Sequence, residues 1–406
     1  MKKFVLLLLS FILLALPFGC GRKDNDTYGE KEMTTPFWTQ NKMYNESVMM
    51  VQTEDGTLAN GNLAFEPTGK IKVMNHTMEI VYEEGKDYTV SGRTITVTEN
   101  TSMPWIKEGV LYGIDMPQGE GLSTQPTSEA GKAKEYDTVL YTESPYLVKN
   151  QLLVTYSYDK SEFDESVIPA YQGDKLPNTK AILESKGCVN IIAYGDSIAT
   201  GCNSTGGGLV SVYEDDPGSL YMPWDMAPYT PTFPELFANT LMNKYGIETT
   251  LFGAAKGGQD SNWAVKNAAD RVVNPDFGYD PDLVVVSLGM NDATLGVPLN
   301  VFKENLLGIV DNIRAKSQKT VEFIFMGTML ANPDAVQCTN QEDYWPIIQQ
   351  VAEEREGVAA VDMGAMHKMF LKNKRYCDMI ANNINHPNDF LIRMYGMNLS
   401  ATLIKY

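Results

Sequence analysis

Residues 189–406 show a regular alternation of apolar strand-like runs with amphipathic helical segments, and few folds accommodate such a pattern. Short, apolar, β-branched runs are separated by longer segments whose apolar residues recur at helical spacing. The predicted strands span 189–194, 248–252, 283–288, 321–326 and 358–362, and the predicted helices span 234–245, 263–273, 301–316 and 342–354. Strands that alternate with helices in this way form a parallel sheet with helices on both faces. Ligands of such sheets bind beyond the carboxyl ends of the strands, so we expect the functional residues just after each strand.

The preceding part of the chain, residues 34–165, has a different rhythm. Short β-branched and aromatic runs are interrupted by Gly, Asn and Pro, a pattern typical of an all-β sandwich or jelly roll. The predicted strands span 70–74, 78–82, 88–90, 94–98, 138–142 and 151–158, and residues 118–134 are predicted to form a long surface loop. A linker that contains Pro and Gly, residues 166–187, joins this domain to an α/β domain over 188–406. Two domains are also expected from the length of the chain, which exceeds what one core usually organises.

The N-terminus has the pattern of an export signal. Lys2 and Lys3 precede an apolar run over 4–16 that is too short to cross a bilayer comfortably. The following Gly19 and Cys20 resemble the cleavage site of a bacterial lipoprotein. We therefore predict a signal peptide over 1–20, a lipid on Cys20 and a solvated tether over 21–33. The mature protein is expected at the cell surface, held to the membrane by this lipid, with simple secretion as the alternative.

Charge and cysteine spacing exclude several partners. The net charge of -18 repels nucleic acid phosphates and anionic lipid headgroups, so the only membrane contact we expect is the lipid on Cys20. The five cysteines lack the short paired spacing of zinc sites and there are only three histidines, so no metal or other cofactor is expected. Disulfide pairing among Cys188, Cys202, Cys338 and Cys377 stays open.

Three predicted strand ends carry residues suited to acyl transfer. The first is followed by a GDS sequence ending in Ser197, a sharp turn that lifts this serine above the sheet, although a serine here also suits a helix cap. The second is followed by a glycine loop, in which we expect Gly258, or alternatively Gly257, to donate its backbone N–H to an oxyanion. The third is followed by Asn291, whose amide can donate a second such hydrogen bond and which is otherwise an ordinary turn residue.

The general base is predicted by its position in the chain. His76 lies in the all-β half, and His367 lies in a predicted helix. His386 stands where the last strand-end loop of the sheet is expected, just before a final helix. We therefore predict His386 as the base, with an ordinary loop histidine as the alternative.

Four short sequence blocks occur in a characteristic order: GDS at 195–197, a glycine loop at 257–258, GMND at 289–292 and HPND at 386–389. In this order the blocks resemble those of the SGNH or GDSL hydrolase superfamily. The resemblance covers about residues 188–406, and it implies a three-layer α/β/α sandwich around a parallel five-stranded sheet. It also implies that Ser197 is the nucleophile and His386 the base, and that the Ser197 N–H, Gly258 and Asn291 form the oxyanion hole.

One position departs from the family pattern. The family places Asp three residues before the histidine, and here that residue is Asn383. Such an acid holds the imidazole in its tautomer and stabilises the imidazolium. Three groups can replace it: the side-chain carbonyl of Asn383, a backbone carbonyl, or Asp378. We favour Asn383 in a Ser-His dyad, because some carbohydrate esterases of this superfamily resemble the chain in pairing such a dyad with an N-terminal β-sandwich.

These observations predict an exported serine esterase that hydrolyses short acyl esters, chiefly acetyl esters, on carbohydrate. Cys202 is a rival nucleophile, but we expect it to serve in packing or in a disulfide. Residues 203–231, with Tyr221, Trp224 and Tyr229, are expected to cover the pocket as a rim or lid. The alternatives are a lipase or thioesterase, and a surface carbohydrate-binding protein with a degenerate hydrolase domain.

Overall fold

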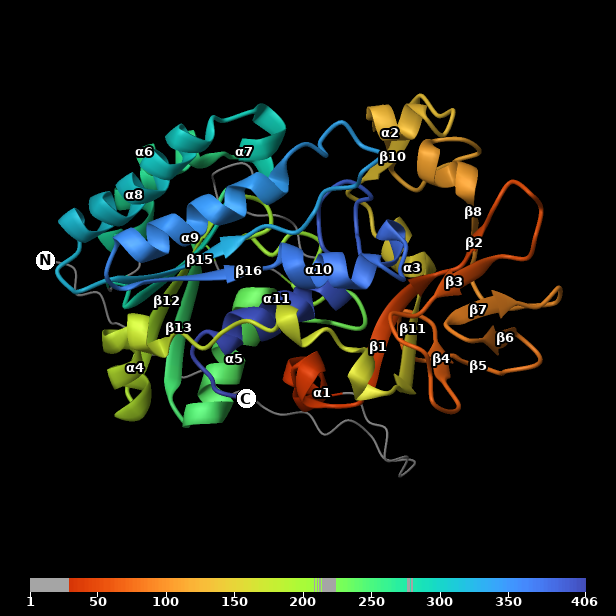
Figure 1. Cartoon of the computed structure of the whole chain (residues 1–406), viewed down its shortest axis with the longest axis horizontal. Helices are drawn as coiled ribbons and strands as arrows, with labels where there is room; N and C mark the ends of the chain where they lie inside the picture. Colours follow the sequence, from red (N-terminus) through yellow and green to blue (C-terminus); the bar gives the residue numbers. More distant parts are fainter. Residues whose placement is uncertain are drawn as a thin grey trace, which may run out of the picture.

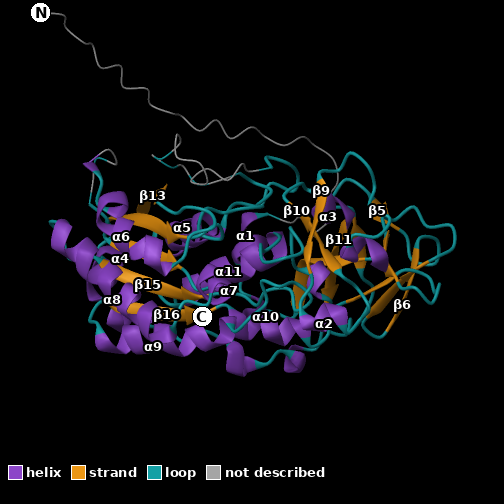
Figure 2. Ribbon diagram, turned by 90° about the horizontal axis from the view of Figure 1, so that it is seen from above, coloured by secondary structure: helices purple, strands orange, loops and turns teal. Residues whose placement is uncertain are grey.

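The computed structural model describes residues 29–207, 209, 211, 213, 224–275, 278 and 280–406. The predicted signal peptide, Cys20 and residues 21–28 of the predicted tether lie outside these residues. A β-rich N-terminal domain and an α/β domain lie side by side (Figure 1; Figure 2). Within the described ranges, no helix combines the length and the apolarity that a membrane span requires.

Five parallel strands form the centre of the α/β domain. Their order in the sheet is β13-β12-β14-β15-β16, and every neighbouring pair is parallel. They span β12 (Cys188–Gly195), β13 (Glu248–Gly253), β14 (Leu283–Ser287), β15 (Glu322–Gly327) and β16 (Val358–Asp362). The predicted sheet is confirmed, and no predicted strand end differs from the observed one by more than a single residue. All five carboxyl ends therefore lie along one edge of the sheet.

Helices cover both faces of this sheet (Figure 1). On one face lie α6 (Ser261–Val272), α8 (Leu299–Lys316) and α9 (Trp345–Glu354), and on the other lie α5 (Phe233–Tyr245) and α11 (Asp389–Ala401). Successive strand residues point to opposite faces, so Val284 and Val286 pack with the first group while Leu283 and Val285 pack with the second. The predicted three-layer α/β/α architecture is confirmed. The described residues also form three shorter α-helices: α4 (Pro177–Glu184) in the linker, and α7 (Met290–Leu295) and α10 (Gly364–Leu371) in the domain.

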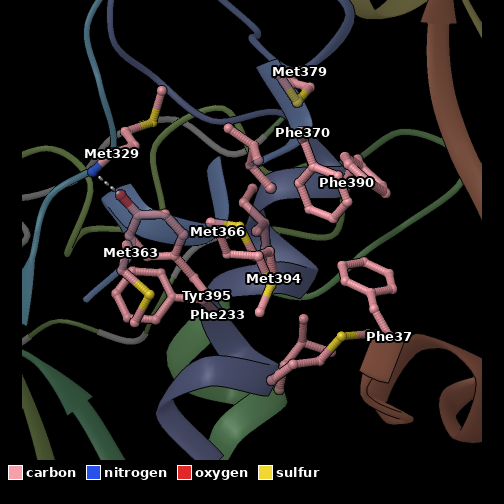
Figure 3. Packing of buried hydrophobic residues seen from close by; sticks show 14 of the residues in the cluster. Phe37, Phe233, Met329, Met363, Met366, Phe370, Met379, Phe390, Met394 and Tyr395 are labelled. Carbon is pink, nitrogen blue, oxygen red and sulfur yellow. Dashed lines mark hydrogen bonds between the residues drawn. The ribbon is translucent and has the colours of Figure 1, made fainter. Parts of the chain in front are cut away.

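The core on the α11 side continues into the N-terminal domain (Figure 3). The ring of Phe37, from the short helix η1 (Phe37–Thr39), lies 5.7 Å from the ring of Phe370 and 5.3 Å from that of Phe390. In the same cluster the hydroxyl of Tyr395 accepts a hydrogen bond of 2.8 Å from the backbone N–H of Met329. One apolar core therefore holds α11 against both domains.

The N-terminal domain consists mainly of antiparallel strands. One sheet has the order β1-β11-β4-β5, a second has the order β6-β7-β3-β2-β8, and β9 and β10 form a separate ribbon. All pairs are antiparallel except β2 with β8. The strands span β1 (Lys42–Met49), β2 (Val51–Gln52), β3 (Asn60–Asn62), β4 (Lys72–Met74), β5 (Val81–Tyr82), β6 (Tyr88–Ser91), β7 (Thr94–Val97), β8 (Ile106–Lys107), β9 (Leu122–Pro126), β10 (Thr138–Thr142) and β11 (Gln151–Ser157). The prediction of a β-rich domain is confirmed, although β1, β2, β3, β8 and β9 were not among the predicted strands.

Two sequence-based boundaries need correction. The predicted surface loop over 118–134 contains strand β9 and the short helix α2 (Glu129–Lys132), because β9 pairs with β10 along its whole length. The predicted tether ends inside the fold, since α1 (Glu30–Thr34) packs near α11. Arg393 of α11 donates hydrogen bonds to the backbone carbonyls of Glu32 and Met33 at 3.3 and 3.4 Å, and these fix α1 in place.

Buried polar contacts also join the two domains. The ammonium group of Lys374 lies 2.6 Å from the Glu46 carboxylate of β1, and neither side chain is exposed. Lys374 also donates to the carbonyl of Ser47 at 2.9 Å, and Asp378 accepts from the backbone N–H of Met49 at 2.8 Å. The segment just before His386 is therefore fixed to the N-terminal domain.

Candidate active site

Ser197 lies in a sharp turn directly after β12, the strand flanked by β13 and β14 in the sheet. The turn requires Gly195, whose φ is 145°, because a β-carbon there would collide with the carbonyl oxygen of Ser287. Asp196 continues the turn, accepting a hydrogen bond of 2.9 Å from the backbone N–H of Ile198. Turns follow the serine, over residues 197–203.

His386 lies in the loop between η8 (Tyr376–Asp378) and α11. Its Nε2 atom is 2.9 Å from Oγ of Ser197, which is hydrogen-bond distance. The side-chain oxygen of Asn382 shapes the loop, because it accepts from the backbone N–H groups of Ile384, Asn385 and His386 at 2.9, 2.9 and 3.0 Å. The two side chains predicted to carry the chemistry are therefore adjacent.

His367 has a different environment from His386. It is fully buried, and its Nδ1 atom accepts a hydrogen bond of 3.2 Å from the backbone N–H of Leu330. Burial lowers the pKa of His367 to about 3. This imidazole therefore stays neutral and takes part in packing.

Three side chains surround the other ring nitrogen, Nδ1 of His386, and the sequence did not predict this group. Oδ1 of Asn203 lies 2.7 Å from Nδ1, Sγ of Cys202 lies 3.2 Å away, and Oε2 of Glu143 lies 3.6 Å away. Asn203 adopts a φ of 63°, a left-handed conformation that Asn tolerates better than most residues. Glu143 comes from the N-terminal domain, between β10 and α3 (Tyr146–Asn150).

Glu143 is ionised in this environment. Burial raises the pKa of its carboxyl group, but the hydrogen bond and positive charge of His386, with hydrogen bonds from Tyr141 and Asn203, outweigh burial and lower the pKa to about 2. The hydroxyl of Tyr141 donates to Oε1 at 2.8 Å, and Nδ2 of Asn203 donates to Oε2 at 3.2 Å. The site therefore has a negative charge on the side of the imidazole opposite Ser197, where it stabilises an imidazolium.

Asn383, the predicted partner of the imidazole, points elsewhere. Its side-chain N–H₂ donates at 3.2 Å to the backbone carbonyls of both Leu111 and Leu140 in the N-terminal domain. The expectation that Asn383 replaces the family's acid is therefore corrected, because its amide is used to join the domains. Asp378 does not fill that place either, since its carboxylate accepts from the backbone N–H groups of Met49 and Arg375, both at 2.8 Å.

The two predicted oxyanion donors lie at the carboxyl ends of the strands on either side of β12. Gly258 has a φ of 73° in the exposed loop between β13 and α6, and Asn291 is the second residue of α7 after β14. The amide of Asn291 donates to the carbonyl of Gln259 at 2.9 Å, which joins the two segments. The same glycine loop is held to the nucleophile turn by the Lys256 N–H, which donates to the Gly195 carbonyl at 3.0 Å. Donation by Gly258 and Asn291 to an oxyanion stays a prediction.

Cys202 is a buried thiol beside the histidine. Burial, together with the negative charges of Glu143 and Asp196, raises its pKa well above the ordinary value, so the thiol is protonated. It is not disulfide-bonded, nor are the other three cysteines of the described part of the chain, Cys188, Cys338 and Cys377. Cys202 is therefore poorly suited to act as a nucleophile.

Part of the predicted rim over the pocket is described. The indole N–H of Trp224 donates to the backbone carbonyl of Glu143 at 3.1 Å, which places this partly buried aromatic ring beside the His386 cluster. Tyr229 is exposed, and Tyr221 lies outside the described residues.

Comparison with known proteins finds a family whose model matches most of the α/β domain. Residues 193–390 match the model described as the GDSL-like Lipase/Acylhydrolase family. No curated protein matches the chain.

Several solved structures are similar to part of the chain. A two-domain esterase active on acetylated mannans, crystallised with mannopentaose, is 14% identical with a TM-score of 0.41, and the match covers 56% of this chain and 53% of that one. An acetylxylan esterase from Geobacillus stearothermophilus is 17% identical with a TM-score of 0.38, and the match covers 52% of this chain and 91% of that one. A putative lipolytic protein of the G-D-S-L family from Desulfitobacterium hafniense is 16% identical with a TM-score of 0.35, with 52% and 98% covered. The chain thus matches about half the length of the two-domain esterase.

Proposed function

We propose that this chain is a carboxylic ester hydrolase of the GDSL-like lipase and acylhydrolase type, and that it removes short acyl groups with Ser197 as nucleophile and His386 as base. The observation that carries the proposal is the 2.9 Å separation of Ser197 Oγ from His386 Nε2. A base must lie within hydrogen-bond reach of the proton it removes, and this pair does.

The reaction begins when Nε2 of His386 takes the hydroxyl proton of Ser197. Oγ attacks the ester carbonyl, and the negative charge that develops on its oxygen is stabilised by donors at the strand ends, for which Gly258 and Asn291 are the candidates. His386 then protonates the departing alcohol. Water repeats the same steps on the acyl-enzyme and releases the acid.

Asn203 and Glu143 hold the imidazole during these steps. A hydrogen bond from Nδ1–H of His386 to Oδ1 of Asn203 fixes the tautomer in which Nε2 is free to accept a proton. The Glu143 carboxylate lies 3.6 Å from Nδ1 and opposes the positive charge that the ring acquires. Both residues are positioning residues, because they act through His386.

The substrate we propose is a short acyl ester, chiefly an acetyl ester, on carbohydrate. The aromatic ring of Trp224 beside the His386 cluster supports this substrate, because aromatic side chains pack against sugar rings. We also propose that the protein is exported, on the basis of the signal sequence over 1–20, with a lipid on Cys20 as its anchor.

A fluorophosphonate probe tests the nucleophile before any substrate is known. The full chain should be labelled at Ser197, as located by mass mapping, and the Ser197→Ala variant should not be. A series of p-nitrophenyl esters then tests the acyl group, with the acetate expected to react fastest and long chains to react poorly. Absence of labelling, with equal background rates for both proteins, would refute the esterase. A preference for long chains would instead indicate a lipase or thioesterase.

A further inference from the structure

A sulfur, a nitrogen and an oxygen atom lie close together beside the catalytic pair. The proposed ester hydrolysis does not require this three-atom cluster. Sγ of Cys202, Nδ1 of His386 and Oε2 of Glu143 come from three separate segments and lie within 4.8 Å of one another. Nδ1 is 3.2 Å from Sγ and 3.6 Å from Oε2, and Sγ is 3.9 Å from Oε2. Thiolate, imidazole and carboxylate are the three side-chain ligands that Zn²⁺ uses in proteins.

The spacing of these atoms matches the size of a zinc ion. A point equidistant from three atoms with these separations lies about 2.1 Å from each, and about 2.2 Å when raised out of their plane as in tetrahedral coordination. Zinc bonds are about 2.0–2.1 Å to imidazole, about 2.0–2.2 Å to carboxylate and about 2.3 Å to thiolate. The three side chains therefore need only small movements to hold such an ion.

A second oxygen, which makes a fourth candidate ligand atom, lies close to two of these three atoms. Oδ1 of Asn203 lies 2.7 Å from Nδ1 of His386 and 2.9 Å from Sγ of Cys202. This oxygen, or a water in its place, completes four-coordination. A set that contains sulfur and imidazole favours zinc-type ions over Mg²⁺ and Ca²⁺, which prefer oxygen ligands alone.

We propose that Cys202, His386 and Glu143 form a binding site for a zinc-type divalent cation, and that a cation bound there inhibits the esterase. Coordination needs the lone pair of Nδ1, so the single proton of the neutral imidazole must sit on Nε2. With that proton in place, Nε2 no longer accepts the proton of Ser197. Binding also releases the Cys202 thiol proton to solvent, because the ligand is the thiolate.

An ion can enter from the Glu143 side of the site. The Glu143 side chain is 32% exposed, whereas that of His386 is 6% exposed. An ion from solvent would therefore meet the Glu143 side chain first and then the two buried ligands. The site forms only when the N-terminal domain, which supplies Glu143, is in place.

Cobalt binding tests the site without any catalysis. In full-length Ser197→Ala protein, titration with Co²⁺ is expected to produce a near-ultraviolet thiolate-to-cobalt charge-transfer band that saturates at one ion per chain. Adding Cys202→Ala should abolish the band, whereas the control Cys188→Ser, which removes an exposed thiol elsewhere, should leave it. A band that survives Cys202→Ala, or no band at all, overturns the site.

Zinc inhibition tests the consequence for the esterase, and only this part rests on the proposed function. Zn²⁺ should slow fluorophosphonate labelling of Ser197 at least tenfold, and EDTA should restore the rate. Each variant is compared with its own metal-free rate, and Cys202→Ala should need at least tenfold more Zn²⁺ for the same inhibition. Equal zinc sensitivity with and without Cys202 contradicts inhibition at this site. A cobalt band in a protein that the probe never labels would leave the metal site standing while the esterase fails.

Discussion

Glu143 of the N-terminal domain lies 3.6 Å from His386 of the α/β domain, measured from Oε2 to Nδ1. This carboxylate also accepts a hydrogen bond of 3.2 Å from Nδ2 of Asn203, whose Oδ1 atom contacts the same imidazole. The ring that faces Ser197 is therefore oriented by groups from both domains. In this chain the β-rich domain supplies a carboxylate to the proposed catalytic site.

Replacing Glu143 should impair catalysis without unfolding the protein. We expect Glu143→Gln to lower kcat/KM about 10- to 100-fold, less than the roughly 10,000-fold loss for an acid bonded directly to the histidine, because Asn203 still fixes the tautomer. Glu143→Asp should restore part of the activity.

Tyr141→Phe is the matched control for Glu143. It removes the 2.8 Å hydrogen bond to Oε1 but keeps the carboxylate, so kcat/KM should change less than about threefold. A Glu143→Gln variant with full activity would show that the carboxylate has only a structural role.

Asn203→Gly separates the side chain of Asn203 from its backbone conformation. Glycine accepts the φ of 63° without strain, so the free energy of unfolding should change little while kcat/KM falls at least about tenfold. Lys186→Gly is the control, because Lys186 is exposed, has a φ of 58° and lies before β12, at the opposite end of this strand from Ser197. Loss of stability without loss of activity in Asn203→Gly would count against its positioning role. Denaturant unfolding and ester hydrolysis measure the two quantities.

The α/β half could be predicted from sequence because its signals are local. A strand buried on both faces is a continuous apolar run, as in residues 283–287, and its ends are marked by polar or glycine residues. The positions of Ser197 and His386 followed from the rule that sites lie beyond strand ends. That Ser197 and His386 lie close together could be predicted without considering the N-terminal domain.

The remainder could not be predicted because it depends on contacts between distant segments. Strand β1 contains Asn45 and Glu46, polar residues whose burial makes sense only with Thr155 and Lys374 beside them. Glu143 carries no local signal for a role at His386, since it lies in another domain. Asn383 matched the position of the family's acid, but its amide faces carbonyls of the N-terminal domain that the sequence could not place.

Replacing Asn383 with the aspartate that the family has at this position should therefore not raise activity in this chain. In Asn383→Asp, a carboxylate oxygen replaces the N–H₂ that donates to the carbonyls of Leu111 and Leu140, so these groups repel and two buried acceptors lose their donor. We expect the free energy of unfolding to fall by about 1–3 kcal/mol, with no gain in kcat/KM. Asp tolerates the φ of 66° as Asn does, so backbone strain does not confuse the result. A stable variant with raised activity would return position 383 to the catalytic arrangement.

Asp196, beside the nucleophile, should make stability depend on pH. Burial raises its pKa to about 7, whereas the pKa of an Asp in the unfolded chain is near its ordinary value of 3.8. Between these pH values the folded state binds the proton more strongly, so this group's contribution to stability falls as pH rises from about 4 to about 7. Asp196→Asn removes that slope, and the variant should gain at least about 1.4 kcal/mol relative to wild type between pH 4 and pH 8. If the difference in free energy of unfolding between Asp196→Asn and wild type is the same at the two pH values, the raised pKa of Asp196 is contradicted. Asp174→Asn, at an exposed site, is the control.

The buried ion pair between Lys374 and Glu46 should be essential for holding the two domains together. Lys374→Met leaves the Glu46 carboxylate buried, with the neutral hydrogen-bond donors Ala64 and Tyr156 but without its ammonium partner, so the free energy of unfolding should drop by about 3–5 kcal/mol. Lys316→Met removes a comparable ion pair with Asp270 at the surface, where the aspartate is 87% exposed, and should cost less than about 1 kcal/mol.

Removing this ion pair should also lower activity, because Lys374 and His386 belong to one segment fixed to the N-terminal domain. Near its unfolding midpoint, Lys374→Met should lose fluorophosphonate labelling together with the near-ultraviolet circular dichroism signal. The double variant with Glu46→Gln should recover part of the lost stability, since no unpaired charge then remains buried. If Lys374→Met is as stable as Lys316→Met, the carboxylate must already be neutralised in another way, and the pair does not hold the domains together.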